Sequence, residues 1–270
     1  MSNLTLRVLS AAVLLLVGFG ALLLDLRARW IVLTAVLVLG AWELSRLAGR
    51  KFAAPVAPWL ASIAVFLLCV PHFPGFAAPV LWNWAVVALS LAVLIAVAFA
   101  RIPITVVAPW ILINGFAVGY LGLWGGKIFE LMYPFTGWES LAPFVFTLAC
   151  IAAADTGAYF TGRAFGKRKL APSISSGKTR EGAVGGVVAS LVVAALLSRY
   201  AGLSIPSALL LGAVLAAASV MGDLFISAYK RWANAKDTSA IIPGHGGVMD
   251  RFDALIFAAP FAWLGFQVLS

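Results

Sequence analysis

Apolar runs long enough to cross a lipid bilayer recur along this 270-residue chain, and they constrain its fold more than any other feature. Each run is about 16 or more residues long, close to or above the length that a transmembrane helix requires. The runs are continuous and rich in Ala, Leu and Val, whereas strands of a membrane β-barrel would alternate apolar and polar residues. With 63% hydrophobic residues, the chain is not a soluble globular domain. We predict an all-α polytopic membrane protein with about nine transmembrane helices, at 8–24, 30–46, 57–73, 80–100, 103–124, 141–161, 183–199, 206–226 and 254–269.

The distribution of Lys and Arg predicts the orientation of these spans. The chain has 19 such residues, and only four lie in odd-numbered loops, namely Arg27, Arg29, Lys127 and Arg199. The other 15 lie at the N-terminus or in even-numbered loops, and loops rich in Lys and Arg stay in the cytoplasm. We therefore expect a cytoplasmic N-terminus and an external C-terminus. The net charge of +9 does not indicate nucleic-acid binding, because the cations lie in short loops between spans.

Acidic residues divide the chain near residue 140. The first part is sparse in acids, and the other six acids lie in or next to the last four spans and their two cytoplasmic loops. We predict a transmembrane scaffold of about five helices over 1–140, and a catalytic transmembrane region with two cytoplasmic basic loops over 141–270. The acids of the first part are Asp25, Glu43, Glu130 and Glu139.

The strongest candidate site lies in and before the last cytoplasmic loop, where ionisable residues crowd into positions 227–253. Charge beside a bilayer is costly and usually functional. Asp223 and Ser227 are four residues apart on a predicted helix and therefore share a face near the cytoplasmic boundary. Asp250 and Asp253 share the first turn of the last predicted helix if it begins near Val248. Carboxylates among cations are typical of a Mg²⁺ site completed by water and phosphate, with helix caps and ion pairs as the alternative.

A second candidate lies in the preceding cytoplasmic loop, between Asp155 and Gly186. A glycine-rich loop with Lys178 and Thr179 at a helix N-terminus suits phosphate, and an ordinary positively charged loop is the alternative. The Ser-Gly-Lys-Thr sequence is not a Walker A motif, because Pro172 occupies the position of the required glycine and no strand is expected before it. Gly182 and Gly186, at a spacing of four, predict close helix packing.

The scarcity of histidine limits the chemistry. His72 and His245 are the only two histidines, and no Ser-His-Asp or Cys-His arrangement is apparent. The reaction should therefore need little general-base catalysis. A phosphomonoester is a suitable nucleophile because it is largely dianionic at neutral pH. Its attack on a nucleotide phosphorus chiefly requires alignment and charge neutralisation.

The segment 227–253 resembles the signature of the CDP-diacylglycerol synthases (phosphatidate cytidylyltransferases). It carries Ser, Lys-Arg, Lys-Asp, His-Gly-Gly, Asp-Arg and a final Asp at that family's spacing. The likeness extends upstream through 155–186, so it covers slightly less than half of the chain. Two positions depart from the usual pattern: Tyr229 replaces an aliphatic residue or Phe, and Ser176 replaces a common Pro.

The resemblance implies transfer of CMP from CTP to phosphatidate, giving CDP-diacylglycerol and pyrophosphate in phospholipid biosynthesis. It also implies Mg²⁺ as cofactor, with K⁺ as an optional second cation, and no nucleic-acid partner. The expected location is the bacterial cytoplasmic (inner) membrane, with the active site facing the cytoplasm in contact with membrane lipid. The sequence leaves open whether the protein forms a homodimer.

Site residues follow from the same resemblance. The metal ligands would be Asp223, Asp250 and Asp253, and the cations would neutralise the triphosphate and the phosphatidate headgroup. The roles of Asp237 and His245 stay open between shaping the loop and contacting the nucleotide. The catalytic set is Asp223, Ser227, Lys230, Arg231, Lys236, Asp237, His245, Asp250, Arg251 and Asp253. The substrate-binding set is Asp155, Arg163, Lys178, Thr179, Glu181, Lys230 and Arg231.

Two other classes of membrane protein fit this sequence less well. A transporter would place charge near the membrane midplane on repeated broken helices, whereas here the charge gathers at one face and no repeat is visible. A CDP-alcohol phosphotransferase would carry a closely spaced pattern of Asp-Gly, Ala-Arg, Gly and two further Asp residues, which this sequence lacks.

Overall fold

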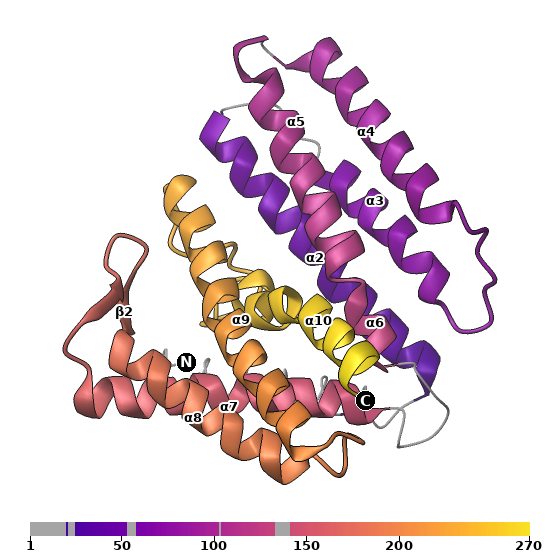
Figure 1. The fold of residues 1–270 in the computed structure, drawn as a ribbon. Coiled ribbons are helices and arrows are strands. Elements are labelled where there is room, and N and C mark those ends of the chain that lie inside the picture. Colours follow the sequence, from indigo (N-terminus) through magenta and orange to yellow (C-terminus); the bar gives the residue numbers. More distant parts are fainter. Residues whose placement is uncertain (1–19, 21–24, 53–57, 103, 133–140) are drawn as a thin grey trace. The chain divides into compact units, whose positions relative to one another are not determined.

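The computed structural model describes residues 20, 25–52, 58–102, 104–132 and 141–270 (Figure 1). The chain forms two compact units, which we describe separately. The first unit comprises the residues up to Gly126 together with Trp232–Arg251, and the second comprises Lys127–Arg231 and Phe252–Ser270. This structural division differs from the predicted functional boundary at residue 140, because the segment Trp232–Arg251 returns to the first unit.

The first unit is a bundle of apolar helices. Helix α2 packs against α3 and α5, and α4 packs against the same two helices. Buried leucines along α2, such as Leu37 and Leu44, form part of its core. The elements are α2 (Leu26–Phe52), α3 (Pro58–Cys69), the 3₁₀ turn η1 (Val70–His72), α4 (Trp82–Arg101), α5 (Ile104–Val118) and the π-helical turn η2 (Gly119–Trp124).

The second unit is also largely helical. Its elements are α6 (Lys127–Met132), α7 (Ala142–Phe165), β1 (Lys169–Ala171), β2 (Ser175–Thr179), α8 (Arg180–Leu197), α9 (Ile205–Trp232) and α10 (Met249–Leu269). The last residue of α9 and the first three residues of α10 belong to the first unit. Helices α7 and α8 pack closely at the predicted glycines. A Cβ atom on Gly182 would lie 2.8 Å from the carbonyl oxygen of Ala158, and one on Gly186 would lie 2.6 Å from that of Ala154. The predicted glycine packing is therefore confirmed.

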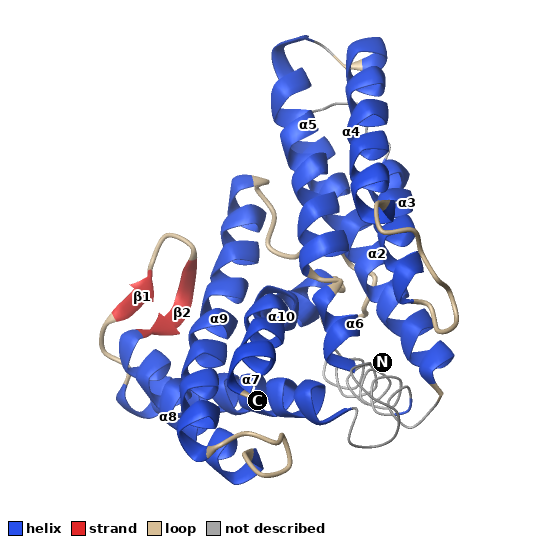
Figure 2. Cartoon of the chain, turned by 45° about the vertical axis from the view of Figure 1, so that its right-hand side comes forward, coloured by secondary structure: helices blue, strands red, loops and turns tan. Residues whose placement is uncertain are grey.

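A small antiparallel hairpin precedes α8, and Figure 2 shows its two strands in red. Lys169 pairs with Thr179, and Ala171 pairs with Ser175. We expected no strand before the Ser-Gly-Lys-Thr sequence, and this expectation was wrong. The turn between the strands includes Pro172, a residue suited to turns because its φ angle is fixed. The hairpin presents Lys178 from a strand rather than from an irregular loop.

Hydropathy located the helices well. Within the described residues, seven helical stretches are long and apolar enough to cross a membrane, and Pro58–His72 is a shorter apolar helix. Eight of the nine predicted spans coincide with described helices, and the first, 8–24, lies outside the described residues. The prediction of an all-α integral membrane protein is confirmed.

Candidate active site

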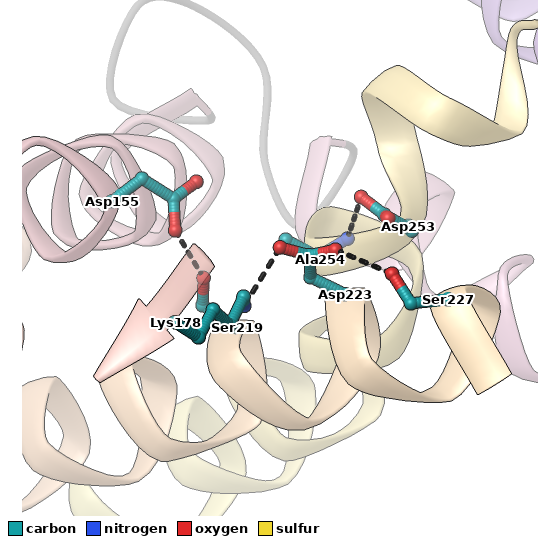
Figure 3. A network of polar contacts seen from close by, with 7 residues as sticks. All are labelled: Asp155, Lys178, Ser219, Asp223, Ser227, Asp253 and Ala254. Atoms are coloured by element: carbon teal, nitrogen blue, oxygen red, sulfur yellow. Dashed lines mark hydrogen bonds and ion pairs between the residues drawn. The ribbon is translucent and has the colours of Figure 1, made fainter. Parts of the chain in front are cut away.

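An ion pair between Lys178 and Asp223 lies at the centre of the polar network in the second unit (Figure 3). The Lys178 Nζ atom lies 2.7 Å from Asp223 Oδ2. The Ser227 hydroxyl donates a hydrogen bond to Asp223 Oδ1 at 3.3 Å. The predicted shared helical face of Asp223 and Ser227 is therefore confirmed, and Lys178 is brought to that face by strand β2.

Asp155 joins the same network from helix α7. Its Oδ1 atom accepts a hydrogen bond from the Ser219 hydroxyl at 2.8 Å. Ser219 lies one turn before Asp223 on α9, so the residues 219, 223 and 227 follow one helical face. Asp155 was predicted as a site residue from the sequence and Ser219 was not, although its spacing of four residues from Asp223 was a usable signal.

Asp253 approaches the network from helix α10. Its side chain is buried, and its Oδ1 atom accepts a hydrogen bond from the Ala254 amide at 2.8 Å. Figure 3 shows Asp253 beside Asp223 and Ser227. Gly222 permits this approach, because a Cβ atom there would lie 2.6 Å from the Phe257 Cβ atom and 2.8 Å from the Asp253 carbonyl oxygen.

Two carboxylates of the second unit are of the ligand type that Mg²⁺ prefers. Asp223 and Asp253 supply two candidate ligands, and Mg²⁺ commonly takes only one or two carboxylates and completes its shell with water and phosphate. In the described ranges of the chain, no group of three or more His, Cys, Asp or Glu residues gathers in an arrangement that could hold a metal by itself. A phosphate-bearing substrate would therefore have to provide further ligands.

Thr179 and Glu181, both predicted substrate contacts, hold the hairpin in place. The Thr179 hydroxyl caps helix α8 by accepting a hydrogen bond from the Gly182 amide at 3.1 Å. The Glu181 carboxylate accepts hydrogen bonds from the amides of Lys167 and Arg168 at 3.1 and 3.2 Å. These bonds fix the strand that carries Lys178.

The other predicted cations lie near the ends of helices. Arg163 is exposed near the end of α7 and donates a hydrogen bond to the Tyr159 hydroxyl at 2.9 Å. Lys230 and Arg231 lie in the last turn of α9, directly after Ser227 in the helix. Lys230 is half-buried and Arg231 is exposed.

Asp250 closes a turn in the first unit. Its Oδ2 atom accepts hydrogen bonds from the Thr238 amide at 2.9 Å, the Thr238 hydroxyl at 3.0 Å and the Gly247 amide at 2.8 Å. The predicted start of this helix near Val248 is confirmed, since α10 begins at Met249. Asp250 thus binds groups of the loop that precedes α10, and both roles that the sequence left open for it, metal ligand and helix cap or ion pair, stay predictions.

The remaining predicted residues of the loop also lie in the first unit. Lys236 and Asp237 are exposed. The Arg251 guanidinium donates two hydrogen bonds to the His245 carbonyl oxygen, at 2.9 and 3.2 Å. His245 and Arg251 therefore shape the turn before α10 through a backbone contact.

Glu43 is a buried acid that was not predicted from the sequence as a site residue. It lies in α2 and is fully buried. Its carboxylate accepts hydrogen bonds from the Thr238 hydroxyl and the Val248 amide. A single acid within the apolar predicted span 30–46 was the available signal, since ionisable residues in such spans are usually functional.

The sequence matches the family described as "Cytidylyltransferase family" over residues 5–269. The chain belongs to this family. A Pseudomonas aeruginosa protein named phosphatidate cytidylyltransferase is 37% identical over 94% of this chain and 93% of its own length. Proteins of the same name from Haemophilus influenzae and Bacillus subtilis are 43% and 46% identical, over 48% and 45% of this chain.

These matches confirm the resemblance drawn from segment 227–253. The matches to the Haemophilus influenzae and Bacillus subtilis proteins each cover 47% of the relative's length. The Pseudomonas aeruginosa match extends over nearly the whole of both proteins. The N-terminal part, which lay outside the segments that carried the resemblance, is therefore included in the similarity. The chain is therefore an integral-membrane member of the cytidylyltransferase family.

Proposed function

We propose that this cytidylyltransferase transfers CMP from CTP to phosphatidate, forming CDP-diacylglycerol and releasing pyrophosphate. The observation that carries the proposal is the partly exposed ion pair between Lys178 on strand β2 and Asp223 on the last turns of the apolar helix α9, where Ser227 donates a hydrogen bond to Asp223. A lipid phosphate is tethered to the membrane by its acyl chains, so its reaction partner must be positioned at such a helix end. The names of the bacterial relatives support the same substrate pair.

The chemistry suits a site with few proton-transfer groups. An oxygen of the phosphatidate phosphate forms a new bond to the α-phosphorus of CTP. The bond between that phosphorus and the oxygen bridging to the β-phosphate breaks, and pyrophosphate leaves with the electron pair. The nucleophile is already ionised at neutral pH, so the protein must mainly align the two phosphates and neutralise their charge.

The cations of the second unit would perform that neutralisation. Lys178 is supported by the hairpin and is assigned to CTP, which arrives from water. Lys230 and Arg231 follow Ser227 at the end of α9 and are assigned to the phosphatidate headgroup. Lys236 and Arg251 are further candidates for phosphate contacts.

Mg²⁺ is the proposed cofactor, with Asp223 and Asp253 as ligands and Asp250 as a further candidate. When bound, this ion would supply a Lewis acid that offsets phosphate charge. K⁺ is retained as an optional second cation. We further infer that the protein lies in the bacterial cytoplasmic (inner) membrane, with the site facing the cytoplasm, where CTP is available.

The proposal is tested by supplying purified protein in nanodiscs with CTP, phosphatidate and Mg²⁺. We expect release of pyrophosphate and formation of CDP-diacylglycerol in equal amounts, and no release when phosphatidate is replaced by diacylglycerol, which lacks the nucleophilic phosphate. Absence of pyrophosphate release with every nucleoside triphosphate would contradict the proposal. Release of CMP from CDP-diacylglycerol and an alcohol would instead support the phosphotransferase alternative.

A further inference from the structure

Glu43 connects the transmembrane helix α2 to the turn that begins α10. Its Oε1 atom accepts hydrogen bonds from the Ser239 hydroxyl at 2.5 Å and the Val248 amide at 2.8 Å. Its Oε2 atom accepts hydrogen bonds from the Thr238 hydroxyl at 2.8 Å and the Met249 amide at 2.9 Å. All of these residues belong to the first unit. A fully buried carboxylate is thus matched by four donors, three from the loop before α10 and one from the first residue of α10.

These donors explain why a carboxylate is present in an apolar helix. The first amides of a helix have no acceptor within that helix, and the positive end of its dipole favours a negative charge. Met249 is the first residue of α10, and Val248 directly precedes it. Glu43 therefore caps α10 from a distant part of the sequence, and the cap in turn satisfies a charge that would be costly to bury alone.

Thr238 links Glu43 to Asp250. Its hydroxyl oxygen lies 2.8 Å from Glu43 Oε2 and 3.0 Å from Asp250 Oδ2. A hydroxyl carries one proton, which it donates to one carboxylate at a time. The contacts are tight, because a Cβ atom on Gly247 would lie 2.0 Å from the Thr238 hydroxyl and 2.6 Å from both Glu43 oxygens. Displacement of Glu43 must therefore shift Asp250 and Gly247.

We propose that Glu43 is a positioning residue for cytidylyl transfer, which fixes the loop 233–248 and the start of α10 so that their polar groups are held in reactive alignment. This loop carries Lys236, Asp237 and His245, and α10 begins with Asp250 and Arg251. The inference rests on the proposed function. Glu43 acts through the loop rather than through contact with substrate.

The first experiment compares Glu43→Gln with a matched control, Ser45→Ala. Glutamine has nearly the same size, but its amide nitrogen cannot accept hydrogen bonds and so opposes two of the four donors. Ser45 is also fully buried on α2, and its hydroxyl makes no hydrogen bond within the described part of the chain. We expect kcat of Glu43→Gln to fall roughly tenfold or more, as misalignment of catalytic groups does. The KM for CTP should stay within about threefold, because Lys178 belongs to the other unit.

The second experiment measures the loop directly. Ala240 lies in the loop and Ala77 lies in another exposed segment of the same unit. A nitroxide is attached to a cysteine at either position, in a variant from which Cys69 and Cys150 have been removed. Glu43→Gln should increase the mobility of the label at 240 and leave that at 77 unchanged.

The two experiments distinguish a positioning role for Glu43 from a role in stabilising the whole unit. A kcat within twofold of that of Ser45→Ala, or unchanged mobility at 240, would overturn the positioning role. An equal increase in mobility at 240 and 77 would also overturn it, because the residue would then stabilise the whole unit. If the unmodified protein transferred no CMP, the proposed function would fail, whereas the label mobility would still test whether Glu43 holds the loop.

Discussion

Lys178 and Asp223 form an ion pair of 2.7 Å between strand β2 and helix α9. Both side chains are partly exposed, with relative accessibilities of 24% and 42%, so a ligand can reach them. An ammonium group has three donors, and the pair therefore leaves Lys178 able to contact phosphate oxygens. This contact brings the hairpin and the charged end of α9 to one place.

Lys178→Ala and Arg231→Ala should affect different substrates. We expect Lys178→Ala to raise the KM for CTP more than that for phosphatidate, and Arg231→Ala to do the reverse. A hydrogen bond to a charged group contributes about 1.5–3 kcal/mol, so each selective change should be about tenfold or greater. The measurement is the initial rate at varied CTP and at varied phosphatidate.

Lys127→Ala is the control for the loss of a lysine ion pair. Lys127 forms a 2.7 Å pair with Glu130 in the same unit and is similarly exposed. Its replacement should leave both KM values within about twofold, since an exposed pair contributes little. Equal effects of Lys178→Ala and Arg231→Ala on both substrates would mean that one phosphate site is shared, and the assignment would be wrong.

Gly222→Ala should destabilise the protein although alanine favours helices. The added methyl group would meet Phe257 and the Asp253 backbone at under 3 Å, and overpacking of this kind costs about 1–3 kcal/mol. Because Asp223 is adjacent, turnover should fall as well. Gly115→Ala in α5 is the control, since its methyl group meets nothing within 4 Å. The midpoint temperature of thermal unfolding in detergent should fall for Gly222→Ala and stay unchanged for Gly115→Ala. An unchanged midpoint for Gly222→Ala would refute the packing argument.

Asp250→Asn should reduce turnover roughly 100-fold or more, as the loss of a key electrostatic group does, without reducing the amount of protein in the membrane. The control is Asp25→Asn. Asp25 accepts a hydrogen bond from the Ala28 amide at 2.9 Å at the start of α2, and asparagine caps helices as well as aspartate. A near-normal rate for Asp250→Asn at saturating Mg²⁺ would show that Asp250 serves only as a cap.

The membrane orientation is tested by cysteines at Ala240 and Ala77, each in the variant lacking Cys69 and Cys150. The charge distribution places Ala240 in the cytoplasm and Ala77 outside. A membrane-impermeant maleimide added to intact cells should therefore label position 77 and not position 240. Labelling of both positions from outside would mean that the number of spans between them is wrong.

Much of the fold could be predicted because bilayer thickness fixes the length of each apolar run. The shared face of Asp223 and Ser227 followed from helical spacing alone. The contact of Thr238 with Glu43 could not be predicted in this way, because it joins residues 195 positions apart. Hydropathy does not encode such pairings, nor does it indicate which of two roles, cap or ligand, a carboxylate such as Asp250 takes.

The hairpin was missed for a related reason. Its strands are only three and five residues long, and Glu181 stabilises the hairpin by accepting hydrogen bonds from the amides of Lys167 and Arg168. The periodicity of such a segment is too brief to distinguish a strand from a loop. The position of Lys178 beside Asp223 therefore became visible only in the folded chain.

The rate of CMP transfer in Asp223→Asn is the decisive measurement, because we place Asp223 at the reaction centre. The measurement follows radiolabel from the α-phosphate of CTP into the lipid fraction. Glu130→Gln is the control, because that change weakens an ion pair of the same unit away from Asp223. We predict a loss of roughly 100-fold or more for Asp223→Asn and a rate within about twofold of the unmodified protein for Glu130→Gln. A rate for Asp223→Asn equal to that of Glu130→Gln, at saturating CTP, phosphatidate and Mg²⁺, would contradict the account.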